Sequence, residues 1–279
     1  MTSIVALAVL LAALLHAAWN AMIKGSADAQ LQTAATVGSA GLMAAVCLPW
    51  VPFPAPDAWP FIGASVVTHM AYYGLLAAAY RHGDLALTYP LMRGVAPLLA
   101  TLLGATLLGE WPAPQAGVGV ALVSAGVIAL GARSPGHTPR GRATGLALAN
   151  AAVIAAYTLI DGVGARRSGD ALGYAAWIFA ANAVPCTAWI CAVRGREVWR
   201  HLAHHPLPAL GGGAASGVAY AICLWAMTAA PIALVAALRE TSVLFAAVLG
   251  SSLLGERLTW LHWVGVAAVA AGVLATRLG

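Results

Sequence analysis

Apolar runs of about twenty residues follow one another almost without interruption along the whole chain. A helix needs about twenty apolar residues to cross the hydrocarbon core of a bilayer, and about ten such runs are present. Short polar, proline or glycine segments separate them, and only the connections 133–142 and 194–205 are distinctly polar. We expect spans at residues 3–23, 31–50, 59–80, 85–109, 113–132, 143–165, 171–193, 207–228, 231–255 and 259–277.

Charged residues are too scarce for other classes of protein. Only 8% of the 279 residues are charged, whereas soluble domains carry about 25%. The chain therefore has too few charged residues to form the polar surface of a soluble enzyme or a nucleic-acid-binding protein. A transmembrane barrel would show shorter segments of alternating polarity. The sequence predicts an all-α integral membrane protein that lies in a lipid bilayer and binds no nucleic acid.

The second half of the chain repeats the first. A shift of 146 residues aligns residues 93–130 with 239–276 without a gap, and 18 of the 38 aligned positions are identical. Rare residues fall in register, because Arg93 aligns with Arg239 and Glu110 with Glu256. Each half then has five spans, and because five is odd the second half enters the membrane from the opposite side. We expect two inverted five-helix repeats, over residues 1–132 and 143–279, joined by the polar loop 133–142.

The ends of the fourth and ninth spans carry the same four letters. Leu107-Leu108-Gly109-Glu110 and Leu253-Leu254-Gly255-Glu256 are each followed by a short turn and a glycine-marked helix. With ten spans arranged as five plus five, this pattern resembles the EamA-type family of the drug/metabolite transporter superfamily. The resemblance implies a metabolite permease, often an exporter of amino acids or related compounds, driven by an ion gradient or by exchange. It also implies a central cavity lined by spans one, three, four, six, eight and nine.

Two arginines lie at matching depths in the fourth and ninth spans. A charge this far inside a membrane normally faces a partner or a wet cavity, and the guanidinium fork suits a carboxylate or phosphate. We hypothesise that Arg93 and Arg239 bind an anionic group of the substrate; the alternative is that they bind backbone carbonyls or pair with Glu240. Glu240 points about 100° away from its neighbour Arg239 on a helix. It could instead pair with Arg93 across the repeat axis, carry a coupling proton, or form another structural bond.

The fourth span also contains two prolines. Pro90 and Pro97 each remove a backbone donor, and Gly94 lies between them. We expect a kinked or locally opened helix here, whose freed carbonyls line a cavity. A kink that serves only helix packing is the alternative.

Further polar side chains share single helix faces in the spans that the resemblance assigns to the cavity. His16 and Asn20 are one turn apart, as are His69 and Tyr73. Such residues often join helices instead of binding a ligand, and the histidines could also relay protons. The candidate substrate-binding residues are Arg93, Arg239, Glu240, Tyr89, His16, Asn20, Trp19, His69, Tyr73, Tyr157, Asp161 and Tyr220.

Other motifs point to structural roles. Glu110 and Glu256 each precede a helix whose free N–H groups a carboxylate can accept, so we expect them to be structural. The histidines of the 201–205 stretch have a loose spacing without a nearby carboxylate or thiol, which favours an interfacial loop over a metal site. No phosphate-binding loop, HExxH or GxSxG motif is present. We therefore expect no cofactor and no enzyme activity.

These features favour a secondary-active permease of small polar metabolites, such as amino acids or related zwitterions and anions. The two inverted halves would alternate access to a site near the midplane. We expect a monomer in the cell inner membrane, with a small-molecule substrate and a proton as the candidate coupling ion. The alternatives are a lipid-modifying membrane enzyme and a receptor or assembly protein without transport. The enzyme would need catalytic groups clustered at an interface, whereas the polar groups here are dispersed toward mid-span.

Overall fold

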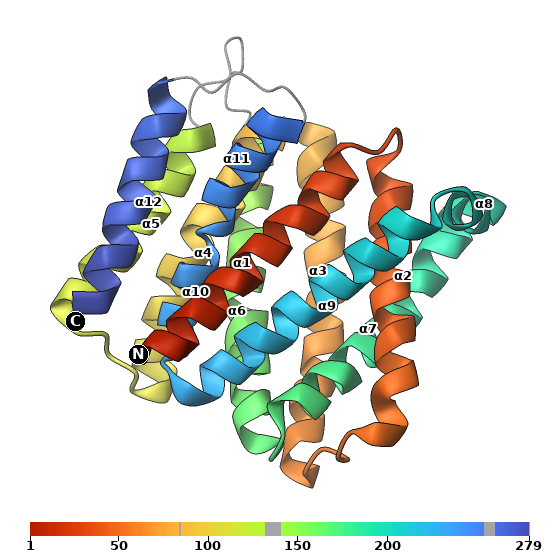
Figure 1. Ribbon diagram of the computed structural model, residues 1–279, viewed down its shortest axis with the longest axis horizontal. Helices are drawn as coiled ribbons and strands as arrows, with labels where there is room; N and C mark the ends of the chain where they lie inside the picture. Colours follow the sequence, from red (N-terminus) through yellow and green to blue (C-terminus); the bar gives the residue numbers. More distant parts are fainter. Residues whose placement is uncertain (84, 132–140, 254–259, 279) are drawn as a thin grey trace.

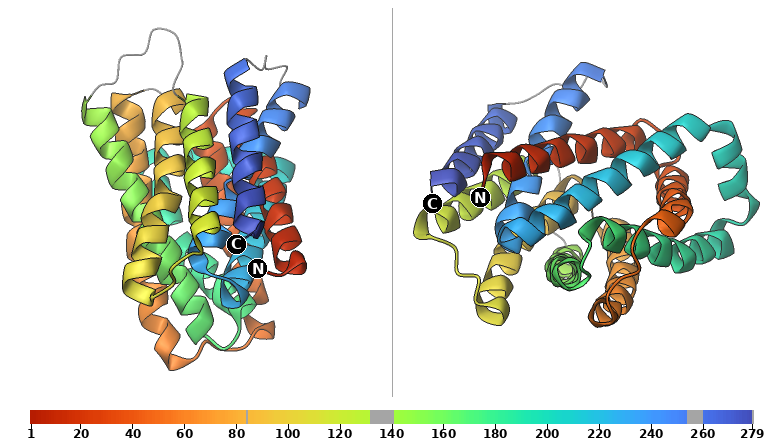
Figure 2. Two further views of the ribbon diagram at one scale, coloured as in Figure 1. Left: turned by 90° about the vertical axis from the view of Figure 1, so that its left-hand side faces the viewer. Right: turned by 60° about the horizontal axis from the view of Figure 1, so that its bottom comes forward.

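The computed structural model describes residues 1–83, 85–131, 141–253 and 260–278, and nearly all of them belong to helices that lie side by side in a bundle (Figure 1). The two termini lie near each other (Figure 2). The α-helices are α1 Ser3–Lys24, α2 Ala29–Cys47, α3 Trp59–His82, α4 Leu85–Leu108, α5 Pro114–Gly131, α6 Gly141–Arg167, α7 Ala171–Arg194, α8 Arg196–His204, α9 Pro206–Ala229, α10 Ile232–Arg239, α11 Ser242–Leu253 and α12 Trp260–Leu278.

Within the described residues, eight helical segments are long and apolar enough to cross a membrane, and the segment Ile232–Leu249 counts as one of them. Two shorter apolar helices, Pro114–Ala129 and Trp263–Ala275, lie within α5 and α12. Large apolar side chains such as Ile4, Leu107 and Leu207 are exposed on the outside of the bundle, as a lipid-facing surface requires. The prediction of an all-α protein with several helices long and apolar enough to cross a membrane is therefore confirmed for the described residues.

Polar side chains fix where several helices begin. Asp28 lies at the N-terminus of α2, where its carboxylate accepts hydrogen bonds from the backbone N–H groups of Gln30 and Leu31, both at 3.0 Å. These backbone donors, together with the guanidinium of Arg194 at 2.7 Å, lower the pKa of the Asp28 carboxyl below its ordinary value. The charged form of Asp28 therefore stabilises the start of α2.

Replacing Asp28 with alanine should lower the free energy of unfolding by about 1 kcal/mol at neutral pH. Because the pKa of Asp28 is lower in the folded protein, this stabilisation is fully present above the ordinary pKa of 3.8 and disappears as the pH falls through the folded value. Unfolding curves of both proteins in detergent, recorded at neutral and at strongly acidic pH, would measure it. The exposed Asp57, replaced in the same way, is the control. A difference that persists below the folded pKa would contradict this role of the charge.

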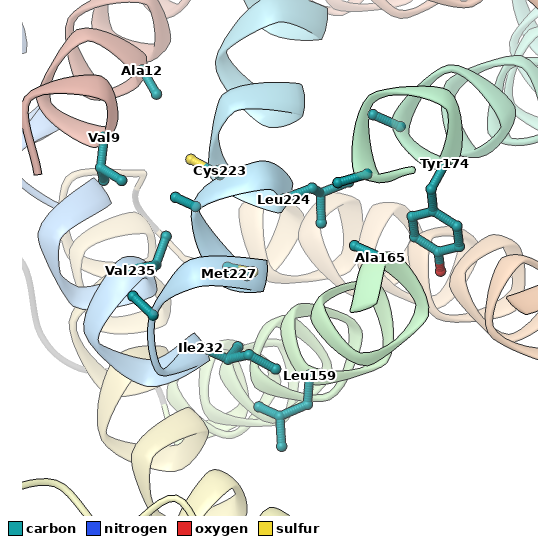
Figure 3. Close-up of a cluster of buried hydrophobic side chains, with 14 of the residues drawn as sticks. Val9, Ala12, Leu159, Ala165, Tyr174, Cys223, Leu224, Met227, Ile232 and Val235 are labelled. Atoms are coloured by element: carbon teal, nitrogen blue, oxygen red, sulfur yellow. The ribbon is translucent and has the colours of Figure 1, made fainter. Parts of the chain in front are cut away.

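The interior is centred on α10, all eight residues of which are buried. Figure 3 shows how α1, α6, α7, α9 and α10 bring apolar side chains together there. Small side chains on α1 and on α6 let each of these helices approach its neighbours closely, as is common where helices pack in membranes. The labelled members of this cluster are Val9, Ala12, Leu159, Ala165, Tyr174, Cys223, Leu224, Met227, Ile232 and Val235.

The polar connection 194–205, which the sequence predicts as a loop, contains the helix α8 instead. Figure 1 shows α8 nearly end-on, so it lies across the direction of the long helices. It is amphipathic, with Val198 buried while Trp199 is exposed beside charged neighbours, which is typical of a helix in a membrane interface. Gly195 has a φ of +55°, which glycine adopts readily, and it separates α8 from α7.

The sequence predicts an interrupted helix in the fourth apolar run and a continuous one in the ninth, whereas the structure has the interruption in the ninth run. Despite Pro90 and Pro97, α4 is a single helix over Leu85–Leu108, because membrane helices tolerate proline where neighbouring groups compensate. The ninth run, expected as one span, divides into α10 and α11. At the division the N–H groups of Glu240 and Thr241 bond carbonyls only three residues back, at 3.1 Å each. The Thr241 hydroxyl also donates to the Leu238 carbonyl at 2.8 Å, which competes with a regular helix.

Helices α5 and α12 pack side by side through a reciprocal glycine contact (Figures 1 and 2). A Cβ atom added to Gly126 would lie 2.8 Å from the Gly265 carbonyl oxygen, and one added to Gly272 would lie 2.6 Å from the Gly119 carbonyl oxygen. In the sequence repeat, Gly126 aligns with Gly272 and Gly119 with Gly265. The two contacts are therefore equivalent, because replacing each glycine by its counterpart in the other half converts one contact into the other.

Substituting Gly126 or Gly272 with alanine should each lower the free energy of unfolding by about 1–3 kcal/mol, because the added methyl group forces the backbones apart. Thermal unfolding in detergent would measure both variants. Gly104→Ala is the matched control, since no described atom lies within 4 Å of the Cβ it would add. Equal stability of Gly126→Ala and Gly104→Ala would contradict the importance of the close contact.

Candidate functional site

Three charged side chains meet at the division between α10 and α11, in the middle of the bundle. Arg93 comes from α4, Arg239 ends α10, and Glu240 follows it directly. They are 6%, 5% and 2% exposed, respectively. Charges buried to this extent in an apolar bundle indicate paired or functional groups.

Arg93 and Glu240 form an ion pair across the two halves of the chain. The Arg93 Nε donates to Glu240 Oε2 at 3.0 Å, and Nη2 lies 2.8 Å from Oε1. The first contact is a hydrogen bond, and the second is an ion-pair contact between opposite charges. Of the three alternatives that the sequence leaves open for Glu240, the structure contains the pair with Arg93, which compensates the charge of Arg93.

Arg239 has a different environment. Its buried Nε has no hydrogen-bond partner among the described residues. A small cavity between α4, α6 and α10, with space for about one water molecule, is lined by Pro97, Thr158, Arg239 and Glu240 together with apolar side chains. An unsatisfied buried donor is costly, so this guanidinium can donate a hydrogen bond to a ligand oxygen. A larger depression on the outside, between Leu98 and Val120, has mainly apolar lining and no charged residue.

Aromatic rings lie next to the arginines. Tyr157 of α6 stacks on His69 of α3, with ring centroids 4.4 Å apart. Tyr72 packs edge-on against Tyr157 at 5.9 Å and against Tyr73 at 5.1 Å. Tyr89 of α4 is within electrostatic reach of Arg93 and Glu240. The candidates Tyr157 and His69 are thus in direct contact, and the candidate Tyr73 contacts Tyr72.

Asp161 and Tyr220 form a second polar pair, on α6 and α9. The Tyr220 hydroxyl donates a hydrogen bond to Asp161 Oδ2, and Asp161 is fully buried. His69 lies close to this carboxylate as well as to Tyr157. The structure therefore brings together three candidates from three different helices.

The candidates on α1 differ in what they contact. Asn20 Nδ2 donates to the backbone carbonyl of His16 at 2.7 Å, so its side chain is used within its own helix. The rings of His16 and Trp19 meet edge-on at 5.1 Å, and the buried Trp19 Nε1 has no partner in the described part of the chain. His16 is within electrostatic reach of both arginines.

Three residues near these groups are absent from the sequence-based set. Thr158 lines the cavity beside Arg239. Ser65 lies against His69, with Oγ 3.2 Å from the ring Nδ1, and Tyr72 contacts Tyr157. The four-residue spacing of Ser65 and His69 would have revealed one of them; no pattern in the sequence separates Tyr72 from Tyr73.

Glu110 is structural as expected, but it caps a different helix. One carboxylate oxygen accepts a hydrogen bond from the N–H of Ile232, the first residue of α10, at 3.0 Å, and not from the following helix α5. The other pairs with Arg166. Arg166 also donates to the carbonyls of Met227 at 2.7 Å and Ala230 at 3.0 Å, so the two residues join α6 to the connection between α9 and α10. The corresponding Glu256 lies outside the described residues.

Comparisons with known proteins agree with this architecture. Residues 142–278 match the family model described as the EamA-like transporter family. A solved structure titled "Crystal structure of protein" is 20% identical, with a TM-score of 0.78 over all of this chain and 98% of that one. This likeness shows a shared fold. The comparison with curated proteins finds no match.

Proposed function

Through residues 142–278 the chain belongs to the EamA-like transporter family of the drug/metabolite transporter superfamily, and we propose that it moves small solutes with a carboxylate or similar anionic group, such as amino acids. Proteins of this family are multi-pass membrane transporters, which suggests that the chain is not an enzyme. We also propose that Arg239 is the residue that binds the anionic group.

The buried Nε of Arg239, which has no hydrogen-bond partner among the described residues, carries this proposal. Arg93 is compensated by Glu240, whereas Arg239 has a free N–H beside a cavity in the middle of the bundle. A substrate carboxylate would satisfy that donor and compensate the charge. Tyr89, Tyr157 and His16 are near enough to contribute to the same site.

We further propose that two inverted repeats, residues 1–132 and 143–279, alternate access to this site. The reciprocal contacts of Gly126 and Gly272 support a two-fold relation between them. Division of the ninth span at a buried charged pair also supports it, because transporters often place their substrate at broken helices near the midplane. Such a chain would act as a monomer in the cell inner membrane, and the family resemblance favours export.

A ligand screen on the purified protein tests this function. Amino acids, organic acids, phosphonates and cationic drugs would be added in detergent, and the melting temperature measured. A ligand that binds only the folded protein adds about 2.7 kcal/mol to the free energy of unfolding at a hundredfold excess over Kd. The melting temperature rises as a consequence. Carboxylate-bearing compounds should stabilise the wild type and not Arg239→Gln.

Arg239→Lys separates the charge from the guanidinium fork and should retain part of the effect. The exposed Arg142, replaced by glutamine, is the matched control and should behave as the wild type does. Stabilisation by cations alone, or equal shifts in Arg239→Gln and the wild type, would refute the assignment of Arg239.

A further inference from the structure

We propose that Asp161 is the group that binds the coupling proton, with Tyr220 and His69 as its positioning residues. The inference rests on the proposed transport function and adds to it the site of a coupling ion. It concerns the pair on α6 and α9 and not the arginines at the division of the ninth span.

The first observation is a buried carboxylate without a counter-ion. Asp161 is 0% exposed, and it forms no ion pair with any described cationic side chain. Its Oδ2 accepts the hydrogen bond of Tyr220, while its buried Oδ1 has no partner in the described part of the chain. A negative charge in this position is costly. Oδ1 is therefore the atom on which a proton can be added, forming an O–H bond and a neutral side chain.

The second observation is the set of groups that face Asp161. They comprise His69 and Ser65 from α3, Tyr220 from α9, Tyr174 from α7 and, at longer range, Arg239 from α10. Tyr157 lies one turn away on α6 itself and stacks on His69. Most of these groups are neutral, so a proton on Asp161 makes the cluster uncharged apart from Arg239.

His69 is held in one orientation by its own helix. Its Nδ1 lies 2.9 Å from the Ser65 carbonyl oxygen, which can only accept, so Nδ1 carries the hydrogen. In the neutral ring Nε2 is then the basic atom. The bond to its own helix fixes the orientation of the ring, which makes His69 a positioning residue beside the carboxylate.

Glu240 is unsuited to this role, although its sequence position suggests it. Both its oxygens are engaged by the Arg93 guanidinium at 3.0 and 2.8 Å. Releasing that carboxylate to bind a proton would leave the charge of Arg93 uncompensated in the interior. Asp161 needs no such exchange, because it forms no ion pair within the described ranges of the chain.

A long-range electrostatic interaction between Asp161 and Arg239 connects the proton to the substrate. An ionised Asp161 attracts the same guanidinium that would bind a substrate anion, and a protonated one does not. Binding of the proton and binding of the anion are therefore coupled, and linkage makes the effect reciprocal.

Two measurements test the proposal on the full chain. Infrared spectra of the purified protein, recorded from mildly alkaline to mildly acidic pH, should show a protonated-carboxyl band that appears with acid in the wild type. Asp161→Asn should lose this band, because the amide keeps the acceptor for Tyr220 but cannot take up a proton. Asp57→Asn, at an exposed carboxylate, should retain it. In proteoliposomes, Asp161→Asn should lose accumulation driven by a pH difference, yet still exchange the compound that stabilises the protein best in the ligand screen.

A titrating band that persists unchanged in Asp161→Asn would overturn the proton-binding site. Loss of the band with accumulation unchanged would overturn the coupling. Should Asp161→Asn not fold, Tyr220→Phe replaces it: the midpoint of the band must change, and an unchanged midpoint would contradict the assignment. If the wild type transports none of the screened compounds, the proposed function fails, whereas the infrared titration still decides whether Asp161 binds a proton.

Discussion

Replacing Glu240 with glutamine should lower the free energy of unfolding by about 3–5 kcal/mol, because it leaves Arg93 as an uncompensated charge in the interior. The two side chains are 8% and 3% exposed, and two short contacts join them. Water therefore cannot replace the lost partner without opening the bundle. Equilibrium unfolding in mixed micelles, with increasing amounts of a denaturing detergent, would measure the change.

A double-mutant cycle isolates the pair. Arg93→Gln should be destabilising for the converse reason, and the double variant should lose less stability than the sum of the two single changes, since neither charge is then left alone. The exposed pair Arg194 and Glu197, at 2.8 Å, is the matched control. Glu197→Gln should cost no more than about 1 kcal/mol. Additive losses in the Arg93–Glu240 cycle would mean that the two residues act independently.

Most of the helical architecture could be predicted from the sequence because hydrophobic length is a strong signal. The expected span at residues 85–109 corresponds to α4, and that at 143–165 lies within α6. The helix α8 was missed because six of its nine residues are polar or aromatic, which leaves little hydrophobic signal. Its apolar Val198 is buried.

The division of the ninth run shows a different limit. Pro90 and Pro97 are the obvious helix-breaking residues, yet α4 continues through them. The break occurs at Glu240 and Thr241, where a side-chain hydroxyl and an ion pair with another helix compete with the regular hydrogen bonds. Long-range contacts of this kind leave no local pattern in the sequence.

The charged members of the candidate set could be selected from the sequence by charge alone. Arg93, Arg239 and Glu240 are costly anywhere in a membrane, so their convergence follows from energetics. The sequence could not distinguish their roles. Only the positions of the helices show that Arg93 has a partner and that, in the part of the chain the structure describes, the Nε of Arg239 has none. For the same reason Asn20 appeared equivalent to Asp161, although its side chain binds its own helix.

Replacing Arg166 with alanine should lower the free energy of unfolding by about 2–4 kcal/mol, since charged hydrogen bonds contribute about 1.5–3 kcal/mol each and this group is partly exposed. The guanidinium joins Glu110 to the Met227 and Ala230 carbonyls. Without it, Glu110 loses its ion-pair partner and two carbonyls near α10 lose their donor. The cap on Ile232 should then weaken, and hydrogen exchange at the start of α10 should become faster.

Arg167 is the matched control, because it is adjacent and has the same side chain. Its guanidinium lies 5.1 Å from the centre of the Phe61 ring, a contact that contributes about 0.5–1 kcal/mol at an exposed site. Glu110→Gln adds a second comparison, since the amide oxygen can still accept from Ile232 while the ion pair is lost. If Arg166→Ala and Arg167→Ala are equally stable, and exchange at Ile232 is unchanged, the start of α10 is held by apolar packing alone. In that case the contact between α6 and the α9–α10 connection contributes nothing to the position of Arg239.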